Sequence, residues 1–284
     1  MSNPANTWGS LPVYQEVRHF AWAVKEMVRY GSWPPPKRPY IALSQAQVAA
    51  RRSKVSGPIE ESYFNHSGRR VNKWIHYLPI YDRALAEFRG KRVTMLEIGV
   101  DQGGSLELWR DYFGEGATIC GIDANPACAT RFDPPNSVRI GSQADPAFLL
   151  SVINEIGRPN IILDDGSHVS VHQKITFQTL WPHLQTGGIY IFEDLHTSYW
   201  REYQGGFRRK GTAVELVKDL IDDQHGWYHQ SKQRLAPPHE IGGITIYDSI
   251  AVIEKVNREQ PGHFKVGVGV DAEPNRPRTR RLRS

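Results

Sequence analysis

Short apolar runs alternate with amphipathic helical stretches along the central part of the chain. The apolar runs predict strands at Thr94–Val100, Ala117–Ile122, Val138–Ile140, Asn160–Leu163 and Gly188–Phe192. Apolar residues at helical spacing predict helices at Ser105–Phe113, Pro146–Ile156, Val171–Leu184 and Thr212–Asp223. Strands and helices in alternation indicate a parallel sheet that is covered by helices on both faces.

Two further strand-like runs end this pattern, Gly243–Tyr247 and Ile250–Val256. Only Asp248 and Ser249 separate them, which is too short a connection for a helical crossover. The two runs are therefore predicted to pair as an antiparallel hairpin. The fold class is α/β, with a mostly parallel sheet of seven strands and an antiparallel last strand.

The first 70 residues have a different pattern. Helical spacing predicts an amphipathic helix over Pro12–Tyr30, and Ser44 with Gln47 fits a capping box at the start of a second, short helix. This extension is interpreted as a lid, an oligomer arm or a helical decoration of the main domain. The predicted domains are the extension, residues 1–70, the main domain, residues 71–269, and a basic disordered tail, residues 270–284.

The main domain is predicted to begin with a helical stretch. It runs from Val71 through Tyr81 to Phe88 and stops at Gly90.

Composition adds limits on the class of protein. Hydrophobic residues make up 39% and charged residues 23% of the 284 residues, as in ordinary globular proteins. The apolar runs are far shorter than the ~20 residues of a membrane-spanning helix, and Met1–Ser10 lacks the features of a secretory signal. Cys120 and Cys128 are the only cysteines, so no disulfide framework is expected. We expect a cytoplasmic protein without membrane contact.

The net charge of +5 comes from the C-terminal end. Five arginines lie between Arg276 and Arg283, interleaved with Pro277, and the rest of the chain is electrically neutral. This pattern favours a solvated tail over an arm that binds RNA. Nucleic acid is therefore not an expected partner.

A glycine-bearing turn follows the first predicted strand, where open parallel sheets bind ligands. It runs Glu97-Ile98-Gly99-Val100-Asp101-Gln102-Gly103-Gly104-Ser105. Gly99 and Gly103 allow the backbone to approach a ligand closely, but Asp101 occupies the second glycine position of the dinucleotide motif. By itself the turn also fits a plain strand-to-helix connection.

Asp123 ends the second predicted strand, at about the 20-residue separation expected for an acid that binds ribose hydroxyls. An NAD site would also explain Asp123, but Glu97 and Asp101 would repel its pyrophosphate. The sulfonium and ammonium groups of S-adenosylmethionine suit an acidic turn. After the third strand, Gln143 and Asp145 lie where an adenine ring would bind, although Asp145 equally fits an N-cap of the helix that starts at Pro146.

Acidic residues follow the fourth and fifth predicted strands: Asp164, Asp165, Glu193 and Asp194. Crowded carboxylates oppose folding unless a positive group neutralises them. A divalent cation is favoured over a purely hydrogen-bonded cluster, and oxygen ligands without cysteine select Mg²⁺, with Mn²⁺ or Ca²⁺ as substitutes.

His168 lies three residues beyond Asp165, which suits a general base that deprotonates an alcohol beside the cation. A two-histidine metal pair of His168 and His172 is the weaker alternative. His196 fits a supporting or a structural role.

Several of these motifs together are similar to a known family. They are Leu96-Glu97-Ile98-Gly99-Val100, Gly103-Gly104-Ser105-Leu106 with Trp109, Asp165-Gly166-Ser167-His168, Trp181-Pro182, Gly187-Gly188 and Glu193-Asp194. The chain from Val71 to Val256 resembles the class I S-adenosylmethionine-dependent methyltransferases. More closely, it resembles the metal-dependent sugar O-methyltransferases of antibiotic tailoring, typified by the mycinamicin and demethylmacrocin enzymes. The resemblance implies a Rossmann-like class I methyltransferase sheet. The N-terminal helical extension predicted above from the residues precedes it and has no counterpart in the resemblance.

The resemblance also implies a role for each matching residue. The catalytic base would be His168, and the metal ligands Asp165, Glu193 and Asp194, with Glu193 standing where the family usually has aspartate. The expected cofactor-binding residues are Glu97, Gly99, Gly103, Ser105, Asp123, Gln143 and Asp164.

The implied function is transfer of the methyl group of S-adenosylmethionine to a sugar hydroxyl of a glycosylated natural product, with Mg²⁺ or Mn²⁺ as metal cofactor. A methyltransferase for a catechol or another phenol is the alternative, and an RNA-associated methyltransferase is a weaker one. We expect a small-molecule glycoside substrate and a homo-oligomer.

An aromatic segment beyond the fifth strand has no counterpart in these motifs. Tyr199, Trp200, Tyr203 and Phe207 surround Gly205 and Gly206. The segment fits a mobile lid over a sugar and a plain packed loop equally well.

Overall fold

The computed structural model describes residues 43–130, 137–231 and 234–267. The predicted helix Pro12–Tyr30 and the arginine tail lie outside the described residues.

The chain divides into two compact units, Met1–Lys54 and Val55–Ser284. In the first unit, α2 (Gln45–Arg52) begins at the predicted capping box, in which the Ser44 and Gln47 side chains each bond the other residue's backbone amide. The domain boundary at residue 70 stays a prediction.

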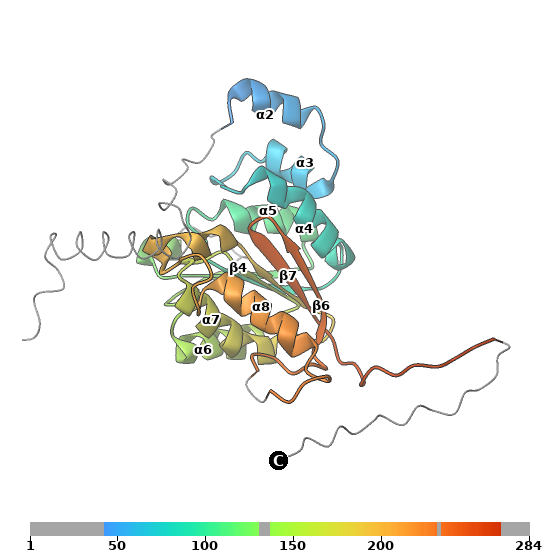
Figure 1. Ribbon diagram of the computed structural model, residues 1–284. Helices are drawn as coiled ribbons and strands as arrows, with labels where there is room; N and C mark the ends of the chain where they lie inside the picture. Colours follow the sequence, from blue (N-terminus) through green and yellow to red (C-terminus); the bar gives the residue numbers. More distant parts are fainter. Residues whose placement is uncertain (1–42, 131–136, 232–233, 268–284) are drawn as a thin grey trace, which may run out of the picture. The chain divides into compact units, whose positions relative to one another are not determined.

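The second unit contains a seven-stranded sheet of order β3-β2-β1-β4-β5-β7-β6 (Figure 1). The strands are β1 (Thr94–Ile98), β2 (Thr118–Asp123), β3 (Ser137–Ile140), β4 (Ile161–Asp164), β5 (Ile189–Phe192), β6 (Ile241–Tyr247) and β7 (Ile250–Lys255). The first five pair in parallel, whereas β7 pairs antiparallel with both β5 and β6. The predicted sheet and its closing hairpin are confirmed.

Helices cover both faces of the sheet (Figure 1). One face carries α6 (Pro146–Ile156), α7 (Ser170–Leu180) and α8 (Ala213–Gln224), whose apolar side chains join those of the strands in one buried cluster. The other face carries α4 (Leu78–Leu85) and α5 (Gly104–Phe113), and α3 (Pro58–Asn65) packs on both of them.

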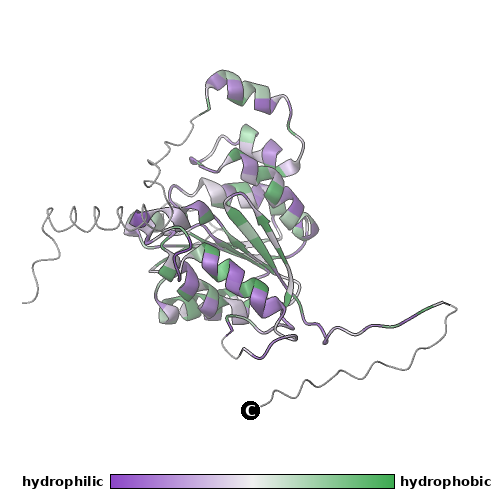
Figure 2. Ribbon diagram, viewed as in Figure 1, coloured by the Kyte–Doolittle hydropathy of each residue, from purple (hydrophilic) through white to green (hydrophobic). Residues whose placement is uncertain are grey.

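Hydropathy follows these layers (Figure 2). The strands are mostly hydrophobic, while α8 carries hydrophilic and hydrophobic residues side by side, as expected for a helix with one buried face. Among the described residues, no helix combines the length and apolar character that crossing a bilayer requires.

The alternation of side chains along a strand sends neighbouring acidic residues to opposite faces. Asp164 pairs in register with Ile98 and Phe192, which belong to the core under α6, α7 and α8. Asp165 follows Asp164 by one residue, and Glu193 follows Phe192 by one residue. The ammonium group of Lys73 binds both Asp165 and Glu193. Asp164 and Asp165, which are adjacent in sequence, therefore lie on opposite sides of the sheet.

The helix predicted from Val71 begins later than expected. Residues 71–74 are not helical, and the helical stretch consists of η2 (Ile75–Tyr77), α4 and η3 (Ala86–Phe88), followed by Gly90 at φ +68°. The reason is tertiary. Lys73 and Trp74 bond to carboxylates about 90 to 120 positions further along the chain, and these contacts hold the backbone outside the helix.

Gly99 lies where two constraints meet. Its φ is +87°, and a Cβ there would lie 2.2 Å from the carbonyl oxygen of Asp165, in the loop after β4. Only glycine satisfies both the backbone conformation and the close approach of the two loops.

We predict that Gly99→Ala destabilises the fold more than an alanine at Gly90. Gly90 also has positive φ, at +68°, but a Cβ at this position would have no atom within 4 Å. Gly90→Ala should lower the free energy of unfolding by about 1–2 kcal/mol through backbone strain alone. Gly99→Ala should lower it further because it adds a backbone clash. Urea unfolding of both variants measures the difference, and equal losses would contradict the prediction.

Candidate active site

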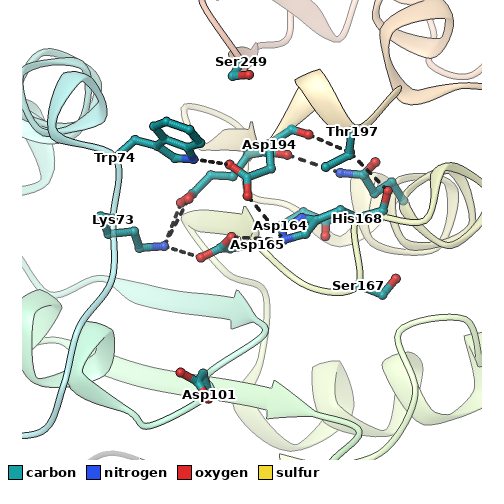
Figure 3. A network of polar contacts seen from close by, with 12 residues as sticks. Lys73, Trp74, Asp101, Asp164, Asp165, Ser167, His168, Asp194, Thr197 and Ser249 are labelled. Atoms are coloured by element: carbon teal, nitrogen blue, oxygen red, sulfur yellow. Dashed lines mark hydrogen bonds and ion pairs between the residues drawn. The ribbon is translucent and has the colours of Figure 1, made fainter. Parts of the chain in front are cut away.

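The acidic residues meet at the carboxyl ends of β1, β4 and β5. Figure 3 shows Lys73 and Trp74 reaching this cluster from one side and His168 from the other. The segment that carries Lys73 and Trp74 precedes α4, so the site combines the strand ends with a stretch of chain far away in sequence.

Lys73 is the centre of the cluster. Its ammonium group lies 2.5 Å from Oδ2 of Asp165, 3.0 and 3.2 Å from the two oxygens of Glu193, and 3.6 Å from Oε1 of Glu97. The side chain is 2% exposed, and those of Glu193 and Glu97 are 2% and 0% exposed. One buried cation therefore contacts three carboxylates.

Burial and charge act in opposite directions on this group. Burial lowers the pKa of Lys73, but the carboxylates of Asp165, Glu193 and Glu97 outweigh it and raise that pKa well above its usual value. Burial and the nearby Asp165 also raise the pKa of Glu193, although Lys73 and the Tyr81 hydroxyl oppose this shift. The short contacts from the Lys73 ammonium to both Glu193 oxygens are those of an ion pair, and Tyr81 adds a hydrogen bond of 2.5 Å.

Glu97 lies within β1 and is fully buried. Burial raises its pKa to about 7, although Lys73 lowers it. Ser105 donates to Oε2 of Glu97 at 2.8 Å. Glu97 and Ser105, both predicted to bind the cofactor, are thus joined to each other beneath the glycine turn.

A second group shares Asp165 with the Lys73 cluster. One ligand atom from each of Asp165, His168 and Asp194 lies within 4.8 Å of the others, a spacing that could hold a metal ion. Nε2 of His168 is 3.8 Å from Oδ1 of Asp165 and 3.4 Å from Oδ2 of Asp194. The structure brings together these three of the four residues predicted for metal binding and catalysis.

Glu193, the fourth of these residues, faces Lys73 and Tyr81 instead. Its role as a metal ligand stays a prediction.

An unusual backbone conformation orients His168 and Asp194. His168 and Asp194 both have φ of +54°, a left-handed conformation that is uncommon outside glycine. Thr197 donates to the carbonyl oxygens of both residues, at 3.3 Å for His168 and 2.7 Å for Asp194. The Thr197 hydroxyl thus links the loops after β4 and β5.

Asp194 receives two neutral hydrogen bonds from the segment before α4. Trp74 Nε1 donates to Oδ1 at 3.1 Å, and the Tyr77 hydroxyl donates to the same oxygen at 2.9 Å. Burial, and then the charge of Asp194, raise the pKa of Tyr77 far above its usual value, so the hydroxyl remains a donor.

The predicted ribose ligand Asp123 lies beside the glycine turn. Its Oδ2 accepts from the amides of Val100 and Asp101 at 3.0 and 3.3 Å, and its Oδ1 accepts from that of Asn125 at 2.7 Å. Gly103 caps α5 at φ +86°. The turn and the acid are therefore neighbours, as the sequence spacing predicts.

Gln143 and Asp164 form an internal network. Gln143 donates to Asp164 and Thr176, each at 3.1 Å, and accepts from the amide of Ser167 at 2.6 Å. Tyr190 donates to the other Asp164 oxygen at 3.0 Å. Burial raises the pKa of Asp164 to about 6, although these bonds oppose it. The structure thus joins these two residues under the loops that follow β3 and β4, and their cofactor roles stay predictions.

His172 and His196, the other two histidines considered from the sequence, form hydrogen bonds with different serines. His172 bonds through Nδ1 to the Ser167 hydroxyl at 2.9 Å, and it is not part of the group that could hold a metal ion among the described residues. His196 lies 2.6 Å from the Ser249 hydroxyl, and burial lowers its pKa. Asp145 caps α6 by accepting from Ala147, the capping role considered from the sequence.

The aromatic segment beyond β5 is divided between site and surface. The Tyr203 ring lies 6.1 Å from that of His168, and the Trp200 ring lies 4.7 Å from that of His196. Tyr199 and Phe207 are about half exposed, at 48% and 49%. Lid and packed loop both stay predictions.

Sequence reasoning missed Lys73, Trp74 and Tyr77. They lie in or beside a stretch predicted to be helical, and no local pattern marks them. The available signal was the charge count: clustered carboxylates require a cation, and the prediction assigned that role to a metal alone.

We predict that Lys73→Met strongly destabilises the fold, because it leaves buried carboxylates without their cation. The expected loss in free energy of unfolding is about 3–5 kcal/mol. Adding Glu193→Gln should recover part of the loss, because the two residues interact directly. The control is Lys218→Met: Lys218 is 52% exposed and pairs with Glu215, so its loss should change stability by about 0–1 kcal/mol. Equal unfolding midpoints for the two single variants would contradict the prediction.

Known proteins resemble this chain in sequence, although no protein-family model matches it. An 8-demethyl-8-alpha-L-rhamnosyl tetracenomycin-C 2'-O-methyltransferase of Streptomyces olivaceus is 35% identical over 243 residues, which cover 81% of this chain and 62% of that protein. A demethylmacrocin O-methyltransferase of Streptomyces fradiae is 36% identical over 206 residues, which cover 66% and 51%. The chain thus spans between about half and three fifths of the length of these curated relatives.

A solved structure agrees with the sequence comparison. The MycE methyltransferase from the mycinamycin biosynthetic pathway, in complex with Mg, SAH and mycinamycin VI, is 27% identical and superposes with a TM-score of 0.62, covering 80% of this chain and 67% of that one. The chain is thus a homologue of these O-methyltransferases, and it has the class I methyltransferase fold.

Proposed function

We propose that the chain is a Mg²⁺-dependent O-methyltransferase that moves the methyl group of S-adenosylmethionine to a sugar hydroxyl of a glycosylated natural product. One observation carries the proposal. Asp165, His168 and Asp194 form a group that could hold a metal ion, in a homologue of an enzyme named as the 2'-O-methyltransferase of a rhamnosyl tetracenomycin.

The donor set fits a hard divalent cation. Asp165 and Asp194 offer carboxylate oxygens, and the two cysteines of the chain, Cys120 and Cys128, are buried elsewhere in the fold. When bound, Mg²⁺ would lower the pKa of an acceptor hydroxyl that it coordinates. We propose Asp165 and Asp194 as ligands, and the ligand role of Glu193 stays a prediction.

His168 is proposed as the general base. Its Nε2 faces the two aspartates, and its Nδ1 is buried without a hydrogen-bond partner among the described residues. Nε2 is therefore the nitrogen that can take a proton from a hydroxyl bound beside the carboxylates. The hydrogen bond from Thr197 to the backbone of His168 supports this orientation.

The glycine turn and Asp123 are proposed to hold the methyl donor. Each carboxylate oxygen has more than one lone pair, so Asp123 can accept from ribose hydroxyls while it bonds the turn. Glu97 and Ser105 support the turn from below. In this proposal catalysis depends mainly on holding the donor methyl and the acceptor oxygen in line.

The sugar acceptor is proposed from the relatives, one of which is named for a rhamnosyl tetracenomycin. The rings of Trp200 and Tyr203 lie near His196 and His168 and offer flat faces for packing against a sugar. We also propose a homo-oligomer and a cytoplasmic location.

We predict that the full chain, stripped of metal with EDTA, binds S-adenosylhomocysteine and Mg²⁺ in separate calorimetric titrations. Asp165→Asn should abolish the Mg²⁺ heat and retain the nucleoside heat, because Asp165 lies in the proposed metal group and not in the glycine turn. Asp222→Asn, which changes an exposed aspartate on α8, should alter neither. Absence of nucleoside binding would overturn the methyltransferase proposal, and a Mg²⁺ heat that survives in Asp165→Asn would overturn the metal site.

His168→Ala should lower turnover by about 10²–10⁴-fold while leaving affinity for S-adenosylhomocysteine nearly unchanged. His172→Ala is the matched control, because His172 bonds Ser167 outside the metal-binding group and its loss should have a small effect. Methyl transfer is measured on a panel of rhamnosylated polyketides, other glycosides and catechols. Equal losses in both variants would refute the assignment of the base, and a preference for catechols would replace the sugar acceptor.

A further inference from the structure

Each aspartate of the proposed metal site has one oxygen held by the segment Lys73–Tyr77. Lys73 donates to Oδ2 of Asp165 at 2.5 Å, while Trp74 and Tyr77 both donate to Oδ1 of Asp194, at 3.1 and 2.9 Å. The opposite oxygens, Oδ1 of Asp165 and Oδ2 of Asp194, are those that face Nε2 of His168 (Figure 3).

The donors in this segment are themselves held in place. Lys73 also bonds both oxygens of Glu193. The Tyr77 hydroxyl lies 3.1 Å from the carbonyl oxygen of Ser249, and the Asp194 amide donates back to it at 3.3 Å. The Trp74 ring packs edge-to-face on His196, with ring centres 5.5 Å apart. Neither aspartate can therefore turn its second oxygen toward the metal site without breaking bonds in a packed network.

One oxygen from each carboxylate suits one alkaline-earth cation better than the other. Ca²⁺ takes six to eight oxygen ligands at long distances and accepts both oxygens of a carboxylate. Mg²⁺ takes six ligands in near-ideal octahedral geometry, keeps several waters, and is commonly held by one or two carboxylates. A site whose two aspartates are each limited to a single oxygen favours Mg²⁺.

We propose that Lys73, Trp74 and Tyr77 are positioning residues that restrict Asp165 and Asp194 to one metal-facing oxygen each, and that this restriction makes the site select Mg²⁺ over Ca²⁺. The inference rests on the proposed metal site and adds to it a determinant of metal choice outside the ligands.

The test removes the two neutral donors to Asp194. Tyr77→Phe and Trp74→Phe keep an aromatic ring and leave the charge of the site unchanged, so a general loss of electrostatic attraction is avoided. Mg²⁺ and Ca²⁺ are titrated separately into metal-stripped full-length protein, for the wild type, both single variants and the double variant. Tyr112→Phe is the control, because Tyr112 is a buried tyrosine on α5 that packs on Phe113 and lies outside the cluster.

Removing a residue that orients a metal ligand typically changes metal affinity by about 10–100-fold. We expect the double variant to bind Mg²⁺ more weakly and Ca²⁺ as tightly or more tightly, which shifts the ratio of the two dissociation constants by about tenfold or more toward Ca²⁺. Each single variant should shift the ratio in the same direction, so the result does not depend on one variant folding. Tyr112→Phe should leave the ratio unchanged.

An unchanged ratio in every variant, with both affinities kept or lowered equally, would overturn the proposal, because a merely structural role predicts such a result. A wild-type chain that binds S-adenosylhomocysteine but neither cation would overturn the metal site itself, and this inference with it. Equal affinity of the wild type for both cations would leave the metal site standing and overturn the selectivity alone.

Discussion

The ion pairs of Lys73 are the interaction on which the rest of the site depends. Four strand-end carboxylates, Glu97, Asp165, Glu193 and Asp194, converge at one edge of the sheet, and a buried ammonium group contacts the first three. Without a positive charge the repulsion and desolvation of these groups would oppose the native fold. With Lys73 in place, a single positive charge offsets part of the negative charge of these three carboxylates. Asp165 and Asp194 each have one oxygen toward His168.

This arrangement divides the acidic residues by task. Side-chain alternation sends Asp164 under the loops, where Gln143 and Tyr190 take up its oxygens. Asp165 lies at the border, with one oxygen toward Lys73 and the other toward His168. A buried hydrogen-bond network and the proposed metal site are thus built from residues that are neighbours in sequence.

The antiparallel hairpin contributes to the site as well as to the sheet. In the turn between β6 and β7, the carbonyl oxygen of Asp248 lies 3.1 Å from Nε2 of His76. The carbonyl oxygen of Ser249 lies 3.1 Å from the Tyr77 hydroxyl, and the Ser249 hydroxyl bonds His196. The same segment that supplies Lys73 is therefore anchored at its far end by the turn. The order of the strands makes this possible, because β7 inserts beside β5 and brings its turn to the ends of the parallel strands.

The sequence by itself determined the strands, most helices, the hairpin and the acidic strand ends, because these depend on local periodicity and on the rule that parallel strands end at one edge. It also predicted Asp165, His168 and Asp194 as neighbours. Only the tertiary structure decided how each acid is used: that Glu193 faces Lys73, and that Tyr77 holds Asp194. These contacts join residues more than 100 positions apart, and their energy comes from burial and charge that no local pattern encodes.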